Sequence, residues 1–170
     1  MIDLTENVNE LFKARWRWLH AEQWADRDRL QNPGVYLLAY DARDLEEQRV
    51  KVDDVYYVGM SNAAGGVSAR LKQFQCAIEK GYGHSAGNRW FVQNKKKAYS
   101  EHRTNEKFYF AARCLPCKSL KSIAGPDDFR TMGQVACLEY YAIAHVLAKS
   151  AAKKVPPLNR SAGGILVERE

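Results

Sequence analysis

The fold predicted for this chain rests on two short segments, GVYLL at residues 34–38 and VYYVGMS at residues 55–61. Both are apolar and rich in β-branched and aromatic residues, which favour strands. If the two strands are neighbours, Tyr36 and Tyr57 lie side by side on one face of a sheet. Gly59 is then expected to leave the backbone open to a ligand, because it has no side chain to block approach.

Length and composition indicate one globular domain. The chain has 170 residues, of which 46% are hydrophobic and 27% charged, and these are not the values of a disordered protein. Its apolar runs fall far short of the roughly 20 residues that span a membrane. Its N-terminus, MIDLTE, is acidic and has no signal-peptide pattern. We therefore expect a cytoplasmic protein that does not bind membranes.

The four cysteines, Cys76, Cys114, Cys117 and Cys137, include one closely spaced pair, CLPC at residues 114–117. A structural zinc site usually needs two such pairs or a cysteine pair with a histidine pair. Reduced thiols are therefore favoured over a zinc site, as is usual in the cytosol.

The positive charge is concentrated after residue 50. Residues 1–50 hold 7 Lys/Arg and 10 Asp/Glu, whereas residues 51–100 hold 8 and 3, and residues 101–170 hold 11 and 7. The net charges are therefore −3, +5 and +4, which sum to the +6 of the whole chain. Such an excess suits a polyanionic partner, although basic proteins are common.

Helical periodicity and breakers divide the rest of the chain. Helices are predicted over residues 5–30, 67–80, 88–99 and 127–149, and a third strand over residues 107–113. The predicted fold class is α/β (α+β), with a small three-stranded, mainly antiparallel central sheet flanked by helices. We expect residues 1–31 to form an N-terminal helical extension packed on a domain of residues 32–170. Its tryptophans, Trp16, Trp18 and Trp24, would pack it there or stack on bases.

The order of five elements resembles the GIY-YIG nuclease family. They are Gly34-Val35-Tyr36, Tyr57-Val58-Gly59, Arg70 on a helix, Glu139 on a long helix, and Pro156-Pro157-Leu158-Asn159. Valine replaces isoleucine in both tripeptides, and the step from Tyr57 to Arg70 is a few residues long, so Arg89 is an alternative for the arginine. The resemblance spans about residues 32–160 and predicts a GIY-YIG-like nuclease domain there.

The resemblance implies a metal-dependent endonuclease that hydrolyses phosphodiester bonds of DNA, here expected to be double-stranded, with Mg²⁺ or Mn²⁺. Glu139 would be the metal ligand and Arg70 would offset phosphate charge. On a helix, Glu139 neighbours Val135, Ala142 and other apolar residues, so its carboxylate needs a compensating cation or a structural ion pair.

Further site residues follow from the same reading. Tyr36 or Tyr57 would activate the attacking water, His84 is a further candidate base, and Asn159 would bond the backbone or a phosphate. Candidate nucleic-acid contacts are Gly59, Ser61, Lys95, Lys96, Lys97, Lys118, Lys121 and Arg160.

Two other functions remain open at this point. The same fold could serve as a nucleic-acid-binding module with weak or no catalysis, or as a protein-interaction domain. The chain is expected to be a monomer or a homodimer, and a double-strand cut would need a dimer or sequential nicks.

Overall fold

A computed structural model describes residues 3–24, 26–102, 105–119 and 123–159. The elements in chain order are α1 (Leu4–Lys13), β1 (Arg17–Trp18), α2 (Arg27–Leu30), β2 (Gly34–Asp41), η1 (Val52–Asp54), β3 (Tyr57–Ser61), α3 (Gly66–Lys80), α4 (Ser85–Gln93), η2 (Tyr99–Glu101), β4 (Lys107–Cys114), α5 (Pro126–Lys149) and η3 (Pro157–Asn159).

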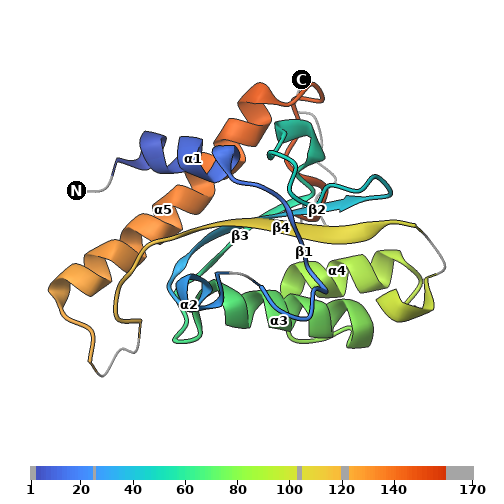
Figure 1. The fold of residues 1–170 in the computed structure, drawn as a ribbon, viewed down its shortest axis with the longest axis horizontal. Coiled ribbons are helices and arrows are strands. Elements are labelled where there is room, and N and C mark those ends of the chain that lie inside the picture. Colours follow the sequence, from blue (N-terminus) through green and yellow to red (C-terminus); the bar gives the residue numbers. More distant parts are fainter. Residues whose placement is uncertain (1–2, 25, 103–104, 120–122, 160–170) are drawn as a thin grey trace, which may run out of the picture.

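One antiparallel sheet, in the order β1-β4-β2-β3, lies between two layers of helices (Figure 1). Alternate residues of β2 enter different cores: Val35 and Leu37 pack with α1 and α5, whereas Tyr36 and Leu38 pack with α3 and α4. This alternation follows from the two-residue period of a strand. The α+β class is confirmed, but the predicted strand count of three is wrong because β1 adds a fourth strand.

The predicted helix over residues 5–30 is also wrong. The helix α1 ends at Lys13, and the chain then extends so that Arg17 pairs with Phe110 and Trp18 with Tyr109. Trp16 is buried in the core with α5, whereas Leu19 is buried in the core with α3. An extended segment at the edge of the sheet turns its residues toward both faces, so it reaches both cores. One continuous helix on one side of the sheet does not. The first thirty residues thus contribute to both cores.

The other predicted elements agree more closely. The helices α3 and α5 and the strand β4 begin and end within one residue of the predicted ranges. The predicted helix at residues 88–99 instead begins at Ser85 and ends at Gln93. Its start is moved forward because the side chain of His84 caps it, and a histidine cap gives a weak sequence signal.

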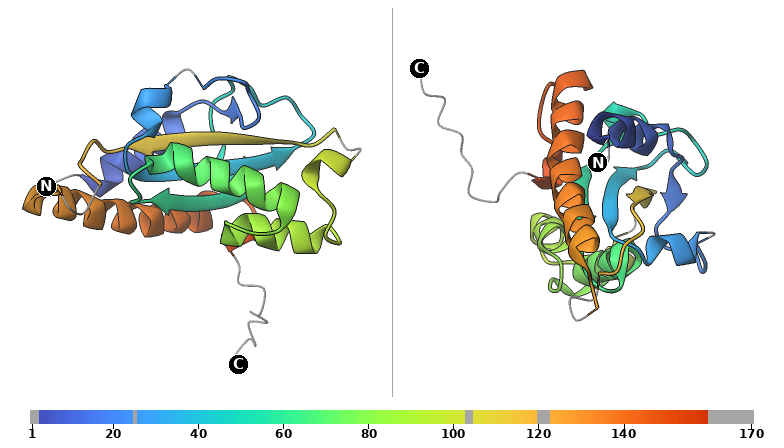
Figure 2. Two further views of the ribbon diagram at one scale, coloured as in Figure 1. Left: turned by 90° about the horizontal axis from the view of Figure 1, so that it is seen from below. Right: turned by 90° about the vertical axis from the view of Figure 1, so that its left-hand side faces the viewer.

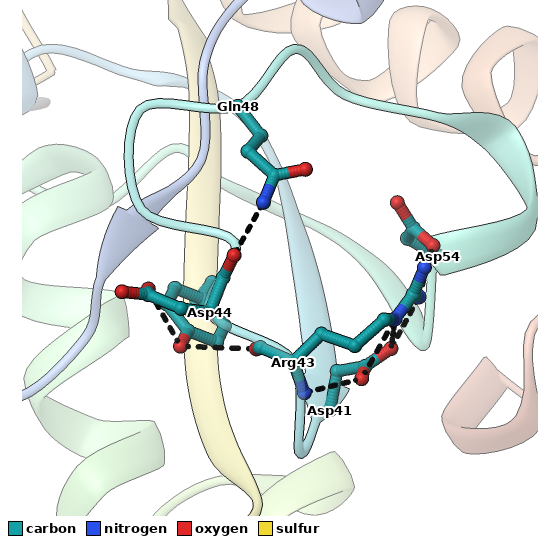
Figure 3. A network of polar contacts seen from close by, with 6 residues as sticks. Asp41, Arg43, Asp44, Gln48 and Asp54 are labelled. Atoms are coloured by element: carbon teal, nitrogen blue, oxygen red, sulfur yellow. Dashed lines mark hydrogen bonds and ion pairs between the residues drawn. The ribbon is translucent and has the colours of Figure 1, made fainter.

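The connection between β2 and β3 is tied down by Arg43 (Figure 3). Its guanidinium donates hydrogen bonds to Asp41 and, at 2.7 Å, to Asp54. The Tyr109 hydroxyl, 3.3 Å from the Arg43 carbonyl oxygen, anchors the loop to β4. These bonds from Arg43 hold the pKa of Asp41 below its usual value. The carboxylates of Asp41 and Asp54 therefore act as structural acceptors in this loop.

Two further features bear on the class of protein. In the described ranges, no helix is both long and apolar enough to cross a membrane. The four cysteines are free thiols, with Cys114 buried and Cys137 exposed.

Candidate functional site

The candidate site lies at the β3 edge of the sheet, where side chains from both helical layers approach two tyrosines. Tyr36 pairs with Gly59 across β2 and β3, and Leu38 pairs with Tyr57. The ring centroids of Tyr36 and Tyr57 are 6.0 Å apart. The predicted placement of the two tyrosines on one face is confirmed. Tyr36 is fully buried and Tyr57 is 7% exposed.

Gly59 has a different role from the one expected. A Cβ at Gly59 would lie 2.5 Å from Cε1 of Tyr57 and 2.7 Å from the Tyr36 hydroxyl oxygen. Gly59 therefore makes room for the two rings, and these rings fill the space that was expected to be open to a ligand. Ser61 is buried, and its hydroxyl accepts a hydrogen bond from the Ala63 amide. Neither residue presents a polar side chain to a nucleic acid.

His84 forms a hydrogen bond with Tyr36, and its other hydrogen bonds fix its tautomer. Its Nδ1 accepts hydrogen bonds from the amides of Ala86 (3.2 Å) and Gly87 (3.3 Å) at the start of α4. Its Nε2 lies 2.8 Å from the Tyr36 hydroxyl oxygen. Burial, with the charges of Arg70 and Arg89, lowers the His84 pKa to about 3, so the ring is neutral near pH 7. Because Nδ1 accepts, Nε2 carries the proton and donates it to Tyr36.

This tautomer makes His84 unsuited to be the general base. Its lone pair is already used in capping α4, and protonation there would break the cap. The Tyr36 hydroxyl oxygen accepts the hydrogen bond from His84. The hydroxyl proton of Tyr36 therefore points away from His84. His84 is therefore a positioning residue for Tyr36.

The tyrosine hydroxyls are neutral donors in this structure. Burial raises the pKa of Tyr36 well above 10, and it raises the pKa of Tyr57 as well. The negative charge of Glu139 raises both pKa values further, whereas the positive charge of Arg70 lowers them. Neither hydroxyl is ionised near pH 7 without an added positive charge.

Arg70, on α3, supplies positive charge to the site. Its charge lowers the pKa values of Tyr36, Tyr57, His84 and Glu139. Its Nη1 donates a hydrogen bond to the Gln73 side-chain oxygen at 2.9 Å, and Arg70 is half-buried.

Arg89, the alternative arginine, is committed to the backbone. Its Nε donates to the Leu158 carbonyl oxygen at 3.1 Å, and its Nη2 donates to the same oxygen. It thereby fastens η3 against α4. The structure therefore favours Arg70 over Arg89 as the residue whose guanidinium faces the site.

Glu139 approaches from α5, in the opposite layer. Its side chain is half-buried and forms no hydrogen bond or ion pair within the described part of the chain. Burial raises the pKa of its carboxyl, and Arg70 partly offsets this rise. A half-buried carboxylate without a bonded partner is costly unless a cation joins it. Over the described residues, no group of three or more His, Cys, Asp or Glu side chains forms a metal cluster. One carboxylate is enough to hold an ion that keeps most of its waters, as Mg²⁺ often does.

Asn159 closes the exposed edge of β3. Its side-chain oxygen accepts from the Val58 amide and its side-chain nitrogen donates to the Val58 carbonyl oxygen, both at 2.7 Å. The Leu158 amide adds a bond to the Tyr56 carbonyl oxygen at 3.1 Å. The amide group takes the place of a neighbouring strand on β3 and holds Tyr57 between Tyr56 and Val58. Of the two partners considered for Asn159, the structure gives the backbone.

The candidate DNA-binding lysines are not gathered at one place. Lys95, Lys96 and Lys97 are exposed in the turn that follows α4. Lys118 is exposed in the β4–α5 connection, which lies at the opposite end of the fold from that turn (Figure 1). Lys121 and Arg160 lie outside the described residues.

Two functional contacts have no clear sequence signal. The bond from His84 to Tyr36 joins residues 48 positions apart, and the bonds from Arg89 to Leu158 join residues 69 positions apart. Only the glycine-bounded loop around His84 hints that its ring could reach the sheet.

Comparison with known proteins adds no relative. No protein-family model, curated protein or solved structure matches this chain.

Replacing His84 with asparagine should flatten the pH dependence of stability. The folded-state pKa, about 3, lies below the ordinary value of 6.5, so the unfolded chain takes up the proton first. In the wild type, this group's contribution is full above pH 6.5 and is lost as the pH falls toward 3, by up to about 1.4 kcal/mol per unit. Asparagine keeps the cap of α4 and removes the titrating ring.

Urea unfolding at pH 7, 6, 5 and 4 measures this difference. The His84→Asn variant should lose less stability over that range than the wild type does. Equal losses in the two proteins would contradict a buried, neutral His84.

Proposed function

We propose that this chain is a metal-dependent endonuclease that hydrolyses phosphodiester bonds in double-stranded DNA, through a site of the GIY-YIG type. The observation that carries the proposal is the convergence of Tyr36, Tyr57, Arg70 and Glu139. They come from four elements and both helical layers, yet their charges and hydroxyls act on one another's pKa values. Hydrolysis of a phosphodiester needs a cation that binds the phosphate, a carboxylate that binds the metal and a hydroxyl that positions the attacking water. Arg70, Glu139 and the two tyrosines supply these groups.

Each residue has a role that its surroundings support. The Arg70 guanidinium binds a phosphate oxygen and offsets the charge that develops there. The Glu139 carboxylate would hold Mg²⁺ or Mn²⁺. When bound there, such an ion would supply positive charge that polarises the phosphoryl group and stabilises the leaving oxygen. Tyr57, the more exposed tyrosine, orients the attacking water. The hydrogen bond from His84 fixes the Tyr36 ring, beside which the Tyr57 ring packs.

A binding module with weak or no catalysis is the second candidate. It is favoured by the burial of the tyrosines, since the Tyr36 hydroxyl has no contact with solvent in this structure. For a protein with buried tyrosines to cleave DNA, substrate binding must first open the site around Tyr57 to water.

Incubation of the purified protein with supercoiled plasmid separates these functions. A nuclease cuts the plasmid in Mg²⁺ and not in EDTA. A binding module shifts labelled duplex in a gel without cutting it in either condition. A protein that neither cuts nor binds overturns both proposals.

Replacing Lys95, Lys96 and Lys97 with alanine should weaken DNA binding and reduce its salt dependence. Each phosphate contact that is lost lowers the slope of log K against log salt by about 0.9. Fluorescence anisotropy at several salt concentrations measures this slope. The Lys51→Ala variant, altered at an exposed lysine that has no proposed role in binding, serves as the control and should leave the slope unchanged. An unchanged slope in the triple variant would mean that this turn is only solvated.

A further inference from the structure

The outer face of α5 carries an exposed strip without charge. The strip contains Gly133, Cys137, Tyr140, Ala144 and Leu147, which are all exposed, and we call it the α5 seam. Tyr140 is 73% exposed and Leu147 is 42% exposed. In both views of Figure 2, α5 (orange) lies at the margin of the fold with one flank turned away from the sheet.

This helix is apolar on two sides. Its inner face, including Val135, Leu138 and Ala142, is buried against the sheet. From residue 131 to residue 148, Glu139 is the one Asp, Glu, Lys or Arg in the sequence. The outer face of a helix on a monomer normally carries charged side chains, and a helix that is apolar all round is normally buried. The composition of α5 therefore indicates a second packing surface.

The spacing of the α5 seam is that of a helix pair. Its residues follow one another at intervals of four, three, four and three positions. This alternation places one face of a helix against another helix over two heptads. The small residues allow close approach, since a Cβ at Gly133 would meet nothing within 4 Å. Tyr140 and Leu147 are the large side chains that would fill the spaces of a partner.

Charge at the two ends of α5 favours an antiparallel partner of the same kind. The first turn contains Asp127 and Asp128, of which Asp127 pairs with Arg130, and the last turn contains Lys149, with Lys153 and Lys154 beyond it. A second α5 in the opposite direction places acidic starts beside basic ends and also opposes the two helix dipoles. A parallel copy would place like charges together.

We propose that two copies of this chain form a symmetric dimer through antiparallel packing of their α5 seams, with Tyr140 near the two-fold axis. Such an interface is self-complementary, which closed two-fold symmetry requires. Glu139 precedes Tyr140 by one residue and lies outside the seam. The dimer therefore leaves the candidate site of each copy uncovered.

For the nuclease, this pairing supplies two active centres in one particle. This consequence rests on the proposed function, because one centre cuts one strand and two centres are needed for a concerted double-strand cut. The dimer itself does not depend on catalysis.

Sedimentation equilibrium tests the interface. The wild-type protein should have twice the chain mass of 19.4 kDa at about 20 µM. The double variant Tyr140→Glu/Leu147→Glu should sediment as a monomer, with association weakened about 100-fold or more, because each copy would bury two charges. Tyr82→Glu, at a residue 61% exposed outside α5, should remain dimeric. A monomeric wild type, or a double variant that still dimerises, would overturn the proposal, as would capture of a different protein on a seam that does not self-associate.

Cross-linking at Cys137 tests the antiparallel direction. With the axis at Tyr140, the two Cys137 residues are six positions apart along the helices, about 9 Å. A bis-maleimide with a spacer of about 10 Å should join the copies, and the Cys137→Ser variant should not be joined. A disulfide between the two Cys137 residues needs α-carbons within about 7 Å, so its formation under mild oxidation would indicate parallel helices and contradict the proposal.

Plasmid products distinguish the two proposals from each other. A dimeric nuclease should give linear plasmid early, and the monomeric double variant should give nicked circles first. If the wild type is dimeric but cuts nothing, the proposed function fails and the dimer stands. If a monomeric wild type cuts, the dimer fails and the nuclease stands.

Discussion

Replacing Glu139 with glutamine should abolish DNA cleavage while the fold and the DNA affinity stay largely unchanged. Glutamine has nearly the same size, so no cavity forms, but it loses the anionic oxygen that a hard cation prefers. A loss of about 3–4 kcal/mol of transition-state stabilisation corresponds to about 10²–10³ in rate. Cleavage at saturating Mg²⁺ and duplex affinity in Ca²⁺ measure the two effects separately.

Stability should move in the other direction. Burial raises the pKa of Glu139, so the charged form is less stable in the folded protein than in the unfolded chain. Removing the charge should leave the melting temperature equal or slightly higher at pH 7, and the Glu101→Gln variant, altered at an exposed carboxylate, is the control. A lower melting temperature, with activity falling only as the protein unfolds, would instead indicate a structural ion pair. Full activity of Glu139→Gln would contradict the proposed mechanism.

Replacing Tyr57 with phenylalanine should lower the cleavage rate by about 10² with little loss of stability. The change removes one hydroxyl and keeps the ring that packs beside Tyr36 and His84. General acid–base or orienting groups typically contribute about 10²–10⁴. Single-turnover cleavage and melting temperature, measured on the same preparation, give both quantities. Wild-type cleavage by this variant would remove the Tyr57 hydroxyl from the chemistry.

The Tyr36→Phe variant provides the comparison for Tyr57. Removal of the Tyr36 hydroxyl leaves the buried Nε2–H of His84 without an acceptor, which costs about 1–3 kcal/mol of stability. Tyr36→Phe should therefore lower both stability and rate, whereas Tyr57→Phe lowers the rate. The exposed Tyr82→Phe should change neither.

The sequence predicted the elements whose boundaries are local. The helix α3 ends at Lys80, and the Gly81 that caps it has a φ of 78°, a conformation that glycine adopts without strain. The strand β1 could not be predicted in the same way, because its two residues are extended only through pairing with Phe110 and Tyr109, more than ninety positions away. Tryptophans at residues 16, 18 and 24 suit a helix or a strand equally well by composition.

The sequence predicted which face of the sheet the two tyrosines share, but it did not predict their contacts. Strand alternation was enough to place Tyr36 and Tyr57 on one face. The reason for Gly59 was missed, because the direction of two tyrosine rings depends on packing across strands. His84 was considered as a base, and only the three-dimensional position of the α4 amides fixes its tautomer and gives it another role.

The bond between Asn159 and Val58 has a consequence for the order in which the chain is made. The two residues are 101 positions apart, so at about 5–20 residues per second the ribosome needs about 5–20 s to pass from one to the other. During that interval Tyr57 already exists, but the backbone beside it faces water. Until Asn159 has been made, the β3 edge beside Tyr57 is therefore incomplete, although most of the residues that surround it have already been synthesised.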